Sequence, residues 1–299
     1  MRVLISGASG LIGSALRDRL VEQGDSTVAL VRHSPRSGEL QWTPGQSLDP
    51  QKLFEFDAIV HLAGKNIAGR WSDKFKQEVR DSRVQGTHTL ADAASASFRQ
   101  CGNPRAFIAA SAVGFYGNRG DEVLTETSAP GQGFLPEVCV AWEAAADPTR
   151  DAGLRVAHMR IGVVLAKNGG ALPPLLLPFR LGLGGRIGDG RQYWSWVALE
   201  DVVGAFAFAL HNENVSGPVN VVAPHPARVS DFVHEIGEVL HRPTMLPLPA
   251  FAVRMLLGKM GETLLLDSAK ALPTKLESAG YKFIHPDLRG ALETALRRD

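Results

Sequence analysis

Cysteine is scarce in this chain of 299 residues. Only Cys101 and Cys139 occur, which is too few for a disulfide framework or a cysteine-rich metal site. Low cysteine use is typical of proteins that fold in a reducing compartment. The chain also enters an apolar run at Val3, which leaves no room before it for a signal segment. We therefore expect a cytoplasmic protein without a metal site.

Neither sign of charge dominates, and no long apolar run is present. Lys and Arg number 32 against 31 Asp and Glu, so the charge of the whole chain favours neither nucleic acid nor an anionic membrane. The most apolar stretch, residues 171–179, holds three prolines and is too short to cross a bilayer. We expect neither nucleic acid nor a membrane as a partner.

A glycine-rich turn lies at the start of the chain, between a short apolar run and residues with helical spacing. In a dinucleotide-binding fold, the first glycine allows a tight turn and the second lets a pyrophosphate approach the backbone. The third lets the helix pack closely on the sheet. The diphosphate then lies at the positive end of the helix dipole. Turns also collect glycine for conformational reasons alone, but this context predicts cofactor contacts at Gly7, Gly10, Leu11, Ile12 and Gly13.

Apolar runs alternate with helical patterns through the first half of the chain. Runs of strand character cover residues 27–31, 58–62, 106–110 and 156–161, and helical patterns cover residues 73–100 and 137–147. Apolar strands that alternate with helices predict a parallel sheet covered on both faces. The fold class is therefore α/β, with a Rossmann-type doubly wound sheet.

The pattern changes after Ala166. Residues 167–195 are rich in glycine and proline, which predicts an irregular element. A helix is expected over residues 197–210, from near Asp201, and a late strand over 218–222. We divide the chain into a nucleotide-binding domain (residues 1–166 plus 196–223) and a smaller substrate-side C-terminal lobe (residues 167–195 plus 224–299).

The residues at the end of the second strand bear on the choice of nicotinamide cofactor. An acidic residue there selects NAD by bonding the ribose 2′-hydroxyl. Here Val31 is followed by Arg32, and no acid occurs before Glu39. A guanidinium at this position can hold a 2′-phosphate, although a solvated basic loop is the alternative. The sequence favours NADP(H) over NAD, with Val31 and Arg32 at the adenosine ribose.

Leu62 is the last residue of the strand at 58–62, and Ala63 follows it. Both are expected to shield the adenine and ribose. His61 precedes them. A histidine at a strand end is more often packed and hydrogen-bonded than catalytic, and we assign it no catalytic role.

These motifs, in this order, resemble the extended short-chain dehydrogenase/reductases, which include nucleotide-sugar epimerases and dehydratases. Further phrases resemble an atypical branch known as the epimerase family proteins. They include Gly64-Lys-Asn-Ile67, Arg160-Ile-Gly-Val-Val-Leu165 and Leu246-Pro-Leu-Pro249. The resemblance implies an NADP(H)-binding fold with a small C-terminal domain and a substrate that is not established.

The resemblance also implies further cofactor contacts. Glu78 and Arg83 lie on the helix that follows the strand at 58–62. Arg83 occupies the family's usual Asn position, from which it could reach a phosphate or ribose. A surface Glu–Arg pair is the alternative. Ile161, Gly162 and Val163 lie at the end of the strand at 156–161. In the family this strand ends beside the nicotinamide, where backbone groups usually contact the carboxamide.

The family's Tyr-x-x-x-Lys pair is missing from the sequence. Alignment on Glu143 places Leu135 at the Tyr position and Cys139 at the Lys position, and neither can replace the chemistry. Ser111 falls one step before the family's catalytic hydroxyl, which favours a structural role. A substitute acid would come from Tyr116, Cys139, Glu137 or the glycine-rich lobe, so the catalytic residues stay unassigned.

The C-terminal lobe offers cationic and aromatic side chains. They could clamp an anionic, ring-bearing ligand such as a nucleotide sugar, or the tryptophans could fill the lobe junction. We expect an NADP(H)-binding, epimerase-like oxidoreductase of small molecules, and the alternative is a redox sensor or interaction module without turnover. The side chains concerned are Arg180, Arg186, Gln192, Trp194 and Trp196.

Overall fold

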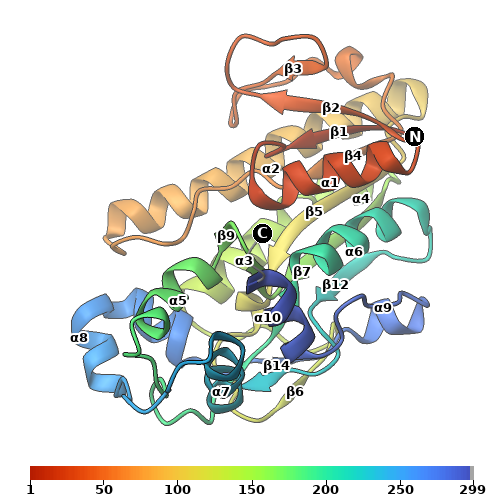
Figure 1. The fold of residues 1–299 in the computed structure, drawn as a ribbon. Coiled ribbons are helices and arrows are strands. Elements are labelled where there is room, and N and C mark those ends of the chain that lie inside the picture. Colours follow the sequence, from red (N-terminus) through yellow and green to blue (C-terminus); the bar gives the residue numbers. More distant parts are fainter. Residues whose placement is uncertain (297–299) are drawn as a thin grey trace.

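A seven-stranded parallel sheet forms the centre of the molecule in the computed structural model, which describes residues 1–296 (Figure 1). The strand order is β12-β7-β5-β4-β1-β2-β3, so the α/β parallel-sheet prediction is confirmed. Its strands are β1 (Arg2–Ser6), β2 (Ser26–Val31), β3 (Glu39–Gln41), β4 (Ala58–His61), β5 (Ala106–Ala112), β7 (Arg155–Ile161) and β12 (Gly217–Val221).

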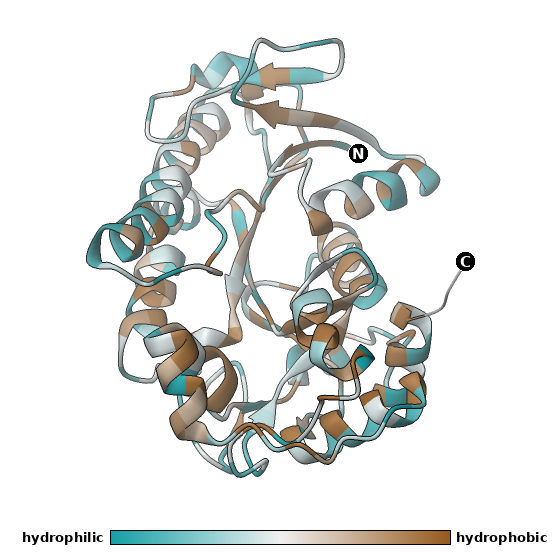
Figure 2. Ribbon diagram, turned by 60° about the vertical axis from the view of Figure 1, so that its left-hand side comes forward, coloured by the Kyte–Doolittle hydropathy of each residue, from teal (hydrophilic) through white to brown (hydrophobic). Residues whose placement is uncertain are grey.

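Helices cover both faces of this sheet, because its strands are apolar on both sides (Figure 2). In β1, Val3 and Ile5 belong to one core, while Leu4 between them belongs to another. The first core lies against α1 (Leu11–Glu22) and α6 (Leu199–His211). The second lies against α2 (Asp73–Cys101), α4 (Asp147–Asp151) and the 3-10 turn η1 (Pro50–Leu53). The sheet is therefore doubly wound.

Helix α2 forms where the sequence predicts it. Ser72 caps its start, with the side chain accepting a hydrogen bond from Phe75 N at 3.2 Å. Gly102 ends the helix in the left-handed conformation. The helix predicted over 137–147 is wrong in its bounds. The chain forms α3 (Phe134–Ala144) and then the short α4, with a break at Ala145 and Ala146 and a proline in the first turn of α4.

A further hydrophobic core lies in the predicted C-terminal lobe and includes residues of the adjoining predicted nucleotide-binding domain, Leu165, Trp196, Ala198 and Ala223. The prediction that residues 167–195 are irregular is wrong in part, because α5 (Leu172–Arg180) forms there. Its first two prolines occupy the helix start, where no backbone N–H is needed. The other elements of the lobe are α7 (Val229–Leu240), α8 (Ala250–Gly261), α10 (Leu288–Leu296), β9 (Gly169–Gly170), β10 (Tyr193–Trp194) and β13 (Ala227–Arg228). Two strands of the predicted nucleotide-binding domain adjoin them, β8 (Val163–Ala166) and β11 (Trp196–Ala198).

The chain then returns to the sheet before it ends. After the π-helical turn η3 (Glu262–Leu266), β14 (Lys270–Ala271) pairs in parallel with β6 (Val123–Leu124), which follows the 3-10 turn η2 (Val113–Tyr116). Helix α9 (Thr274–Ser278) packs on β12. Asp201 at the start of α6 accepts hydrogen bonds from Ile284 N at 2.7 Å and His285 N at 2.9 Å. Residues 274–285 therefore lie on the sheet, away from the core of the lobe.

None of the helices in residues 1–296 combines the length and the apolar character that crossing a bilayer requires.

Candidate active site at the carboxyl edge of the sheet

The glycine-rich turn is required by backbone contacts of the chain itself. Gly7 has φ +70°, and a Cβ there would lie 2.8 Å from the Leu62 carbonyl carbon. A Cβ on Gly13 would overlap the Gly7 carbonyl oxygen. The third glycine therefore lets the helix approach the turn, whereas the sequence predicted an approach to the sheet. Both contacts hold β1, α1 and the β4 exit together.

The start of helix α1 has no side-chain cap within residues 1–296, and its first turn holds no acidic residue. Gly10 is exposed and extended, with φ −78° and ψ 172°. Leu11 packs toward Gly169, and Ile12 packs on the core. The positive end of the helix dipole and its free N–H groups are therefore directed to whatever lies in front of Gly10.

The ends of four parallel strands bring the next predicted residues together. Val31, Leu62 and Ile161 lie at or just after the carboxyl ends of β2, β4 and β7, and these strands share one edge with β1. Ser6 Oγ accepts hydrogen bonds from Leu62 N at 3.2 Å and Ala63 N at 3.3 Å. These contacts place the β4 exit directly beside the glycine-rich turn.

His61 belongs to the interior of the fold. Its side chain is fully buried, with Nδ1 2.6 Å from Ser6 Oγ and with Trp42 and Phe107 beside the ring. Burial lowers the pKa of His61 to about 4. The ring is therefore neutral near pH 7, in agreement with the packed role expected from the sequence.

Arg32 is an exposed cation at the end of β2, and among residues 1–296 no hydrogen bond or ion pair engages it. Glu39, the first acid after it, turns to the loop. Its carboxylate accepts a hydrogen bond from Arg36 N at 2.9 Å and lies 3.9 Å from His33 Nδ1. The strand end therefore presents a free guanidinium and no available carboxylate.

Glu78 and Arg83 lie beside the β4 exit, but they do not pair with each other. Lys65 Nζ lies 2.6 Å from Glu78 Oε2, while Arg83 Nη1 donates to the Lys65 carbonyl at 2.9 Å. The Arg83 guanidinium stacks on Trp142, 4.9 Å from the ring centroid. The surface Glu78–Arg83 pair considered from the sequence is therefore wrong. The roles of Lys65 and Trp142 were missed, although Lys65 directly follows Gly64 at a strand exit.

Arg83 is a half-buried cation without a carboxylate partner within residues 1–296. Burial lowers its pKa, because desolvation disfavours the charged form. A desolvated cation is stabilised when an anion binds to it. This arrangement makes Arg83 a candidate ligand-binding residue.

The β7 exit differs from the expectation for Gly162. A Cβ there would overlap the Ser195 carbonyl oxygen of the chain itself, so internal packing explains the glycine. The backbone N–H groups are also occupied, since Gly162 N donates to Val221 O at 3.0 Å and Val163 N to Ser195 O at 2.8 Å. These two amides are therefore not free to bind a carboxamide.

Three of the candidate groups, Tyr116, Cys139 and Ser111, are buried and engaged. Tyr116 is fully buried, and its hydroxyl lies 2.7 Å from Asn220 Oδ1 and accepts a hydrogen bond from Arg160 at 3.0 Å. Burial raises the pKa of Tyr116, and it raises the pKa of Cys139 to about 12. Ser111 Oγ donates to Glu143 at 2.6 Å. None of these three groups offers a proton readily near pH 7.

A buried ion pair joins α3 to β7 behind this edge. Arg160 donates from Nε and Nη2 to the two Glu143 oxygens at 2.8 and 2.9 Å, and its guanidinium lies 3.5 Å from the Phe115 ring centroid. Arg160 is 3% exposed. Sequence reasoning assigned no role to this pair. Its signal was the position of Glu143 within the otherwise apolar residues 138–146 and of Arg160 within the largely apolar residues 156–166.

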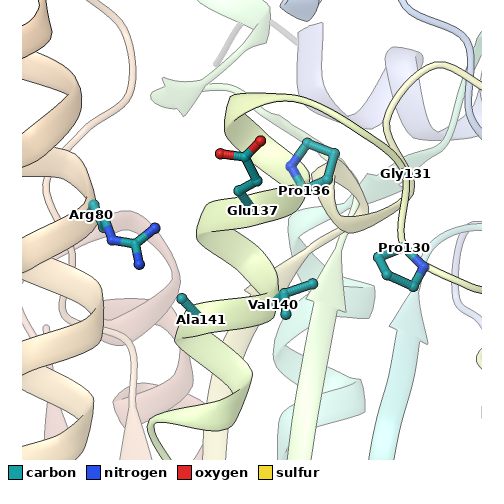
Figure 3. Close-up of a pocket in the computed structure, with 7 residues that line it drawn as sticks. All are labelled: Arg80, Pro130, Gly131, Pro136, Glu137, Val140 and Ala141. Atoms are coloured by element: carbon teal, nitrogen blue, oxygen red, sulfur yellow. The ribbon is translucent and has the colours of Figure 1, made fainter.

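Glu137 lies on the opposite side of α3 from Cys139. It lines a shallow pocket of about 380 Å³ between α2 and α3, and Arg80 reaches toward the pocket from α2 (Figure 3). Glu137 is exposed, whereas Cys139 is buried beside Gly114 in the turn η2. Glu137 is therefore not directed to the edge that carries the other candidates.

The aromatic residues of the lobe fill its core. Trp196 is fully buried and donates to the His225 carbonyl at 3.0 Å, and Trp194 packs on Phe232. Gln192 donates to the carbonyls of Ile187 and Leu265. The ligand-clamp interpretation is therefore wrong for these side chains, while Arg180 and Arg186 remain exposed.

A family comparison agrees with this geometry. The profile of the NAD dependent epimerase/dehydratase family matches residues 3–223. The chain belongs to this family. A second profile, a domain of unknown function (DUF1731), matches residues 248–295.

Individual family members match over the full chain. Epimerase family protein MT2273 of Mycobacterium tuberculosis is 44% identical over 299 residues, which are 99% of this chain and 98% of the relative. The crystal structure of human epimerase family protein SDR39U1 with NADPH is 34% identical, with a TM-score of 0.88 and 99% of each chain covered. A nucleoside-diphosphate sugar epimerase from Corynebacterium glutamicum is 36% identical, with a TM-score of 0.80 over 99% of this chain and 58% of that chain.

Proposed function

We propose that this epimerase family protein binds NADP(H) at the carboxyl edge of its sheet and acts on a small molecule as an epimerase-like oxidoreductase. The observation that carries the proposal is the uncapped start of α1 after β1, together with an Arg32 at the end of the neighbouring β2 that has no partner within residues 1–296. The human relative solved with NADPH supports the same cofactor. The proposed contacts are Gly7, Gly10, Leu11, Ile12, Gly13, Val31, Arg32, Leu62, Ala63, Glu78, Arg83, Ile161, Gly162 and Val163.

In this proposal each part of the edge has its own task. The free N–H groups at the start of α1 hold the diphosphate, and the Arg32 guanidinium holds the 2′-phosphate. Leu62 and Ala63 cover the adenosine, and Arg83 binds an anionic or hydroxyl group of ribose or substrate. Ile161, Gly162 and Val163 form a wall, since two of their amides are bonded within the chain. When bound, the nicotinamide supplies or accepts a hydride.

The substrate side is proposed to be the lobe predicted over residues 167–195 and 224–299, apart from residues 274–285, which pack on the sheet. A nucleotide sugar is the substrate class we favour, because the Corynebacterium relative bears the name of a nucleoside-diphosphate sugar epimerase. The uncompensated charge of Arg83 also favours an anionic ligand.

A second candidate is NADP(H) binding without turnover, as a redox sensor or interaction module. Its support is the state of the candidate acids, because Tyr116, Cys139 and Ser111 are buried and engaged. Turnover therefore needs a proton donor from elsewhere, such as the substrate or water.

The cofactor proposal is tested by titrating intrinsic tryptophan fluorescence with NADPH and NADH. We expect tighter binding of NADPH. Arg32→Ala should weaken NADPH about 10- to 100-fold, because hydrogen bonds to a charged group contribute about 1.5–3 kcal/mol. NADH affinity should change little. Arg36→Ala, in the same exposed loop, is the matched control. Equal preference in wild type and Arg32→Ala would reject the role of Arg32.

Turnover is tested separately. Purified protein with NADPH is incubated with pooled sugar nucleotides and carbonyl metabolites, and the nicotinamide absorbance is followed. A change that depends on the protein supports the enzyme, whereas a silent pool with intact NADPH binding supports the sensor.

A further inference from the structure

The near-balance of charge in the whole chain conceals a strong local imbalance. Residues 171–188 and 241–262 together carry five Lys or Arg residues and a single acid, Glu262. The cations are Arg180, Arg186, Arg242, Arg254 and Lys259. Both segments belong to the C-terminal lobe, around α5 and α8.

The same two segments hold most of the exposed large apolar side chains of the described residues. Nine of fourteen lie there, with exposed fractions from 42% to 84%. Exposed apolar residues scattered singly are normal, but a concentration of this kind marks an interaction surface. The nine residues are Leu177, Leu181, Leu183, Met245, Leu246, Phe251, Met255, Leu256 and Leu257.

One local arrangement occurs in both helices. Leu177 and Arg180 lie on α5, and Leu181 follows as its C-cap in the right-handed helical region, so the spacing i, i+3 and i+4 puts the three side chains on one face. Phe179 next to them is buried in the lobe core. In each helix an outward apolar pair therefore surrounds an outward cation, while an inward apolar residue anchors the turn.

On α8 the corresponding outward residues are Phe251, Arg254 and Met255, and the buried anchor is Val253. Bridges between Gly185 and Met245 and between Ile187 and Leu248 hold the chain after α5 beside the chain before α8. Figure 1 shows both helices on the same flank of the lobe. We call the nine apolar residues and five cations of these segments the α5–α8 surface.

The excess of positive charge on the α5–α8 surface favours an anionic partner. Glu262 is shared by Arg254 and Lys259, at 2.9 Å from each. Arg180, Arg186 and Arg242 have no ion pair within residues 1–296. The Met and Leu side chains between them call for an apolar partner. One class of partner combines both properties, the headgroup and acyl boundary of a bilayer that contains anionic lipid.

We propose that the α5–α8 surface docks on anionic lipid bilayers and places Phe251, Met255 and the α5 leucines at the acyl boundary. The proposal goes beyond cofactor binding and does not depend on it. It is compatible with the lack of a spanning helix in residues 1–296, because shallow docking needs an amphipathic face only. The proposal departs from the expectation that the protein has no membrane partner, which was drawn from the balanced charge of the whole chain and the lack of a long apolar run, because the charge imbalance here is local.

The test is flotation of the full chain with vesicles of phosphatidylcholine alone or with phosphatidylglycerol at 3:1. We expect at least tenfold stronger binding to the anionic vesicles, and weaker binding in high salt because screening reduces the attraction. Phe251→Ser with Met255→Ser, and separately Arg180→Gln with Arg186→Gln, should each reduce binding at least tenfold. The control, Val21→Ser with Ile284→Ser, changes two residues that are each 60% exposed elsewhere and should bind as wild type does.

Three outcomes would overturn the proposal. The wild-type chain stays unbound with anionic vesicles, or the control loses as much binding as the surface variants. The third is a dimer in light scattering that Phe251→Ser with Met255→Ser dissociates, without binding of the wild type to vesicles, which would assign the surface to a second copy of the chain. Circular dichroism and NADPH titration of each variant separate loss of folding from loss of docking.

Discussion

Removal of the Glu143 carboxylate should destabilise the protein strongly, because it leaves the Arg160 guanidinium buried and uncompensated. In Glu143→Leu, the acceptor of three hydrogen bonds is lost, two from Arg160 and one from Ser111. Breaking a buried pair in this way costs about 3–5 kcal/mol. Domains are stable by about 5–15 kcal/mol in total, so the free energy of unfolding should fall by a large fraction.

The assay is urea unfolding of a double-mutant cycle. Arg160→Met should also be destabilising, since it leaves the carboxylate buried. The double variant should be clearly more stable than the sum of the two losses implies, with a coupling free energy of at least about 2 kcal/mol. As a matched control, Glu293→Leu breaks the exposed Arg289–Glu293 pair and should cost at most about 1 kcal/mol. A loss below about 1 kcal/mol for Glu143→Leu, or strictly additive effects, would refute the reasoning.

Two further predictions follow from groups whose pKa values are shifted by burial. His61 titrates near 4 when folded and near 6.5 when unfolded, so its contribution is complete above pH 6.5 and is lost as the pH falls toward 4, by about 3 kcal/mol in all. Urea unfolding should show a lower free energy of unfolding at pH 5.0 than at pH 7.5 in the wild type and in the control His33→Asn, which changes an exposed histidine. The difference between the two pH values should be smaller in His61→Gln, and equal differences in all three proteins would contradict the prediction. Burial holds the pKa of the Cys139 thiol at about 12 while Cys101 is exposed, so a thiol reagent at pH 7.5 should label Cys101 quickly and Cys139 only after unfolding. Fast labelling of both thiols in the folded wild type, or of Cys139 in folded Cys101→Ser, would contradict the prediction because it would show that Cys139 is accessible.

The sheet could be predicted from the sequence because its signals are local. Apolar strands, the glycine-rich turn and the capped helix at 73–101 each depend on a few consecutive residues. Helix α5 was missed because glycine and proline were taken to mean irregular chain, whereas prolines at a helix start are compatible with the helix. Local composition therefore predicts an element well where the residue types involved favour only one kind of secondary structure.

The site was predicted less completely because its charges pair over long sequence separations. Glu78 was expected near Arg83, five residues away, but it binds Lys65 in the strand exit. The contact between Gly162 and the Ser195 carbonyl was also not predicted. The Arg160–Glu143 pair joins a strand to a helix 17 residues earlier. None of these partners can be read from spacing alone, because only the folded sheet brings them together.

The return of residues 274–285 to the sheet has a consequence for the whole chain. Asp201 is fully buried, and two backbone amides from the far end of the protein complete its hydrogen bonds. The region matched by the C-terminal profile is therefore not a detachable module. A chain cut short after residue 248 would expose the flank of α6 and leave the buried Asp201 carboxylate without these two hydrogen bonds. The first part of the chain therefore depends on the last part for its stability.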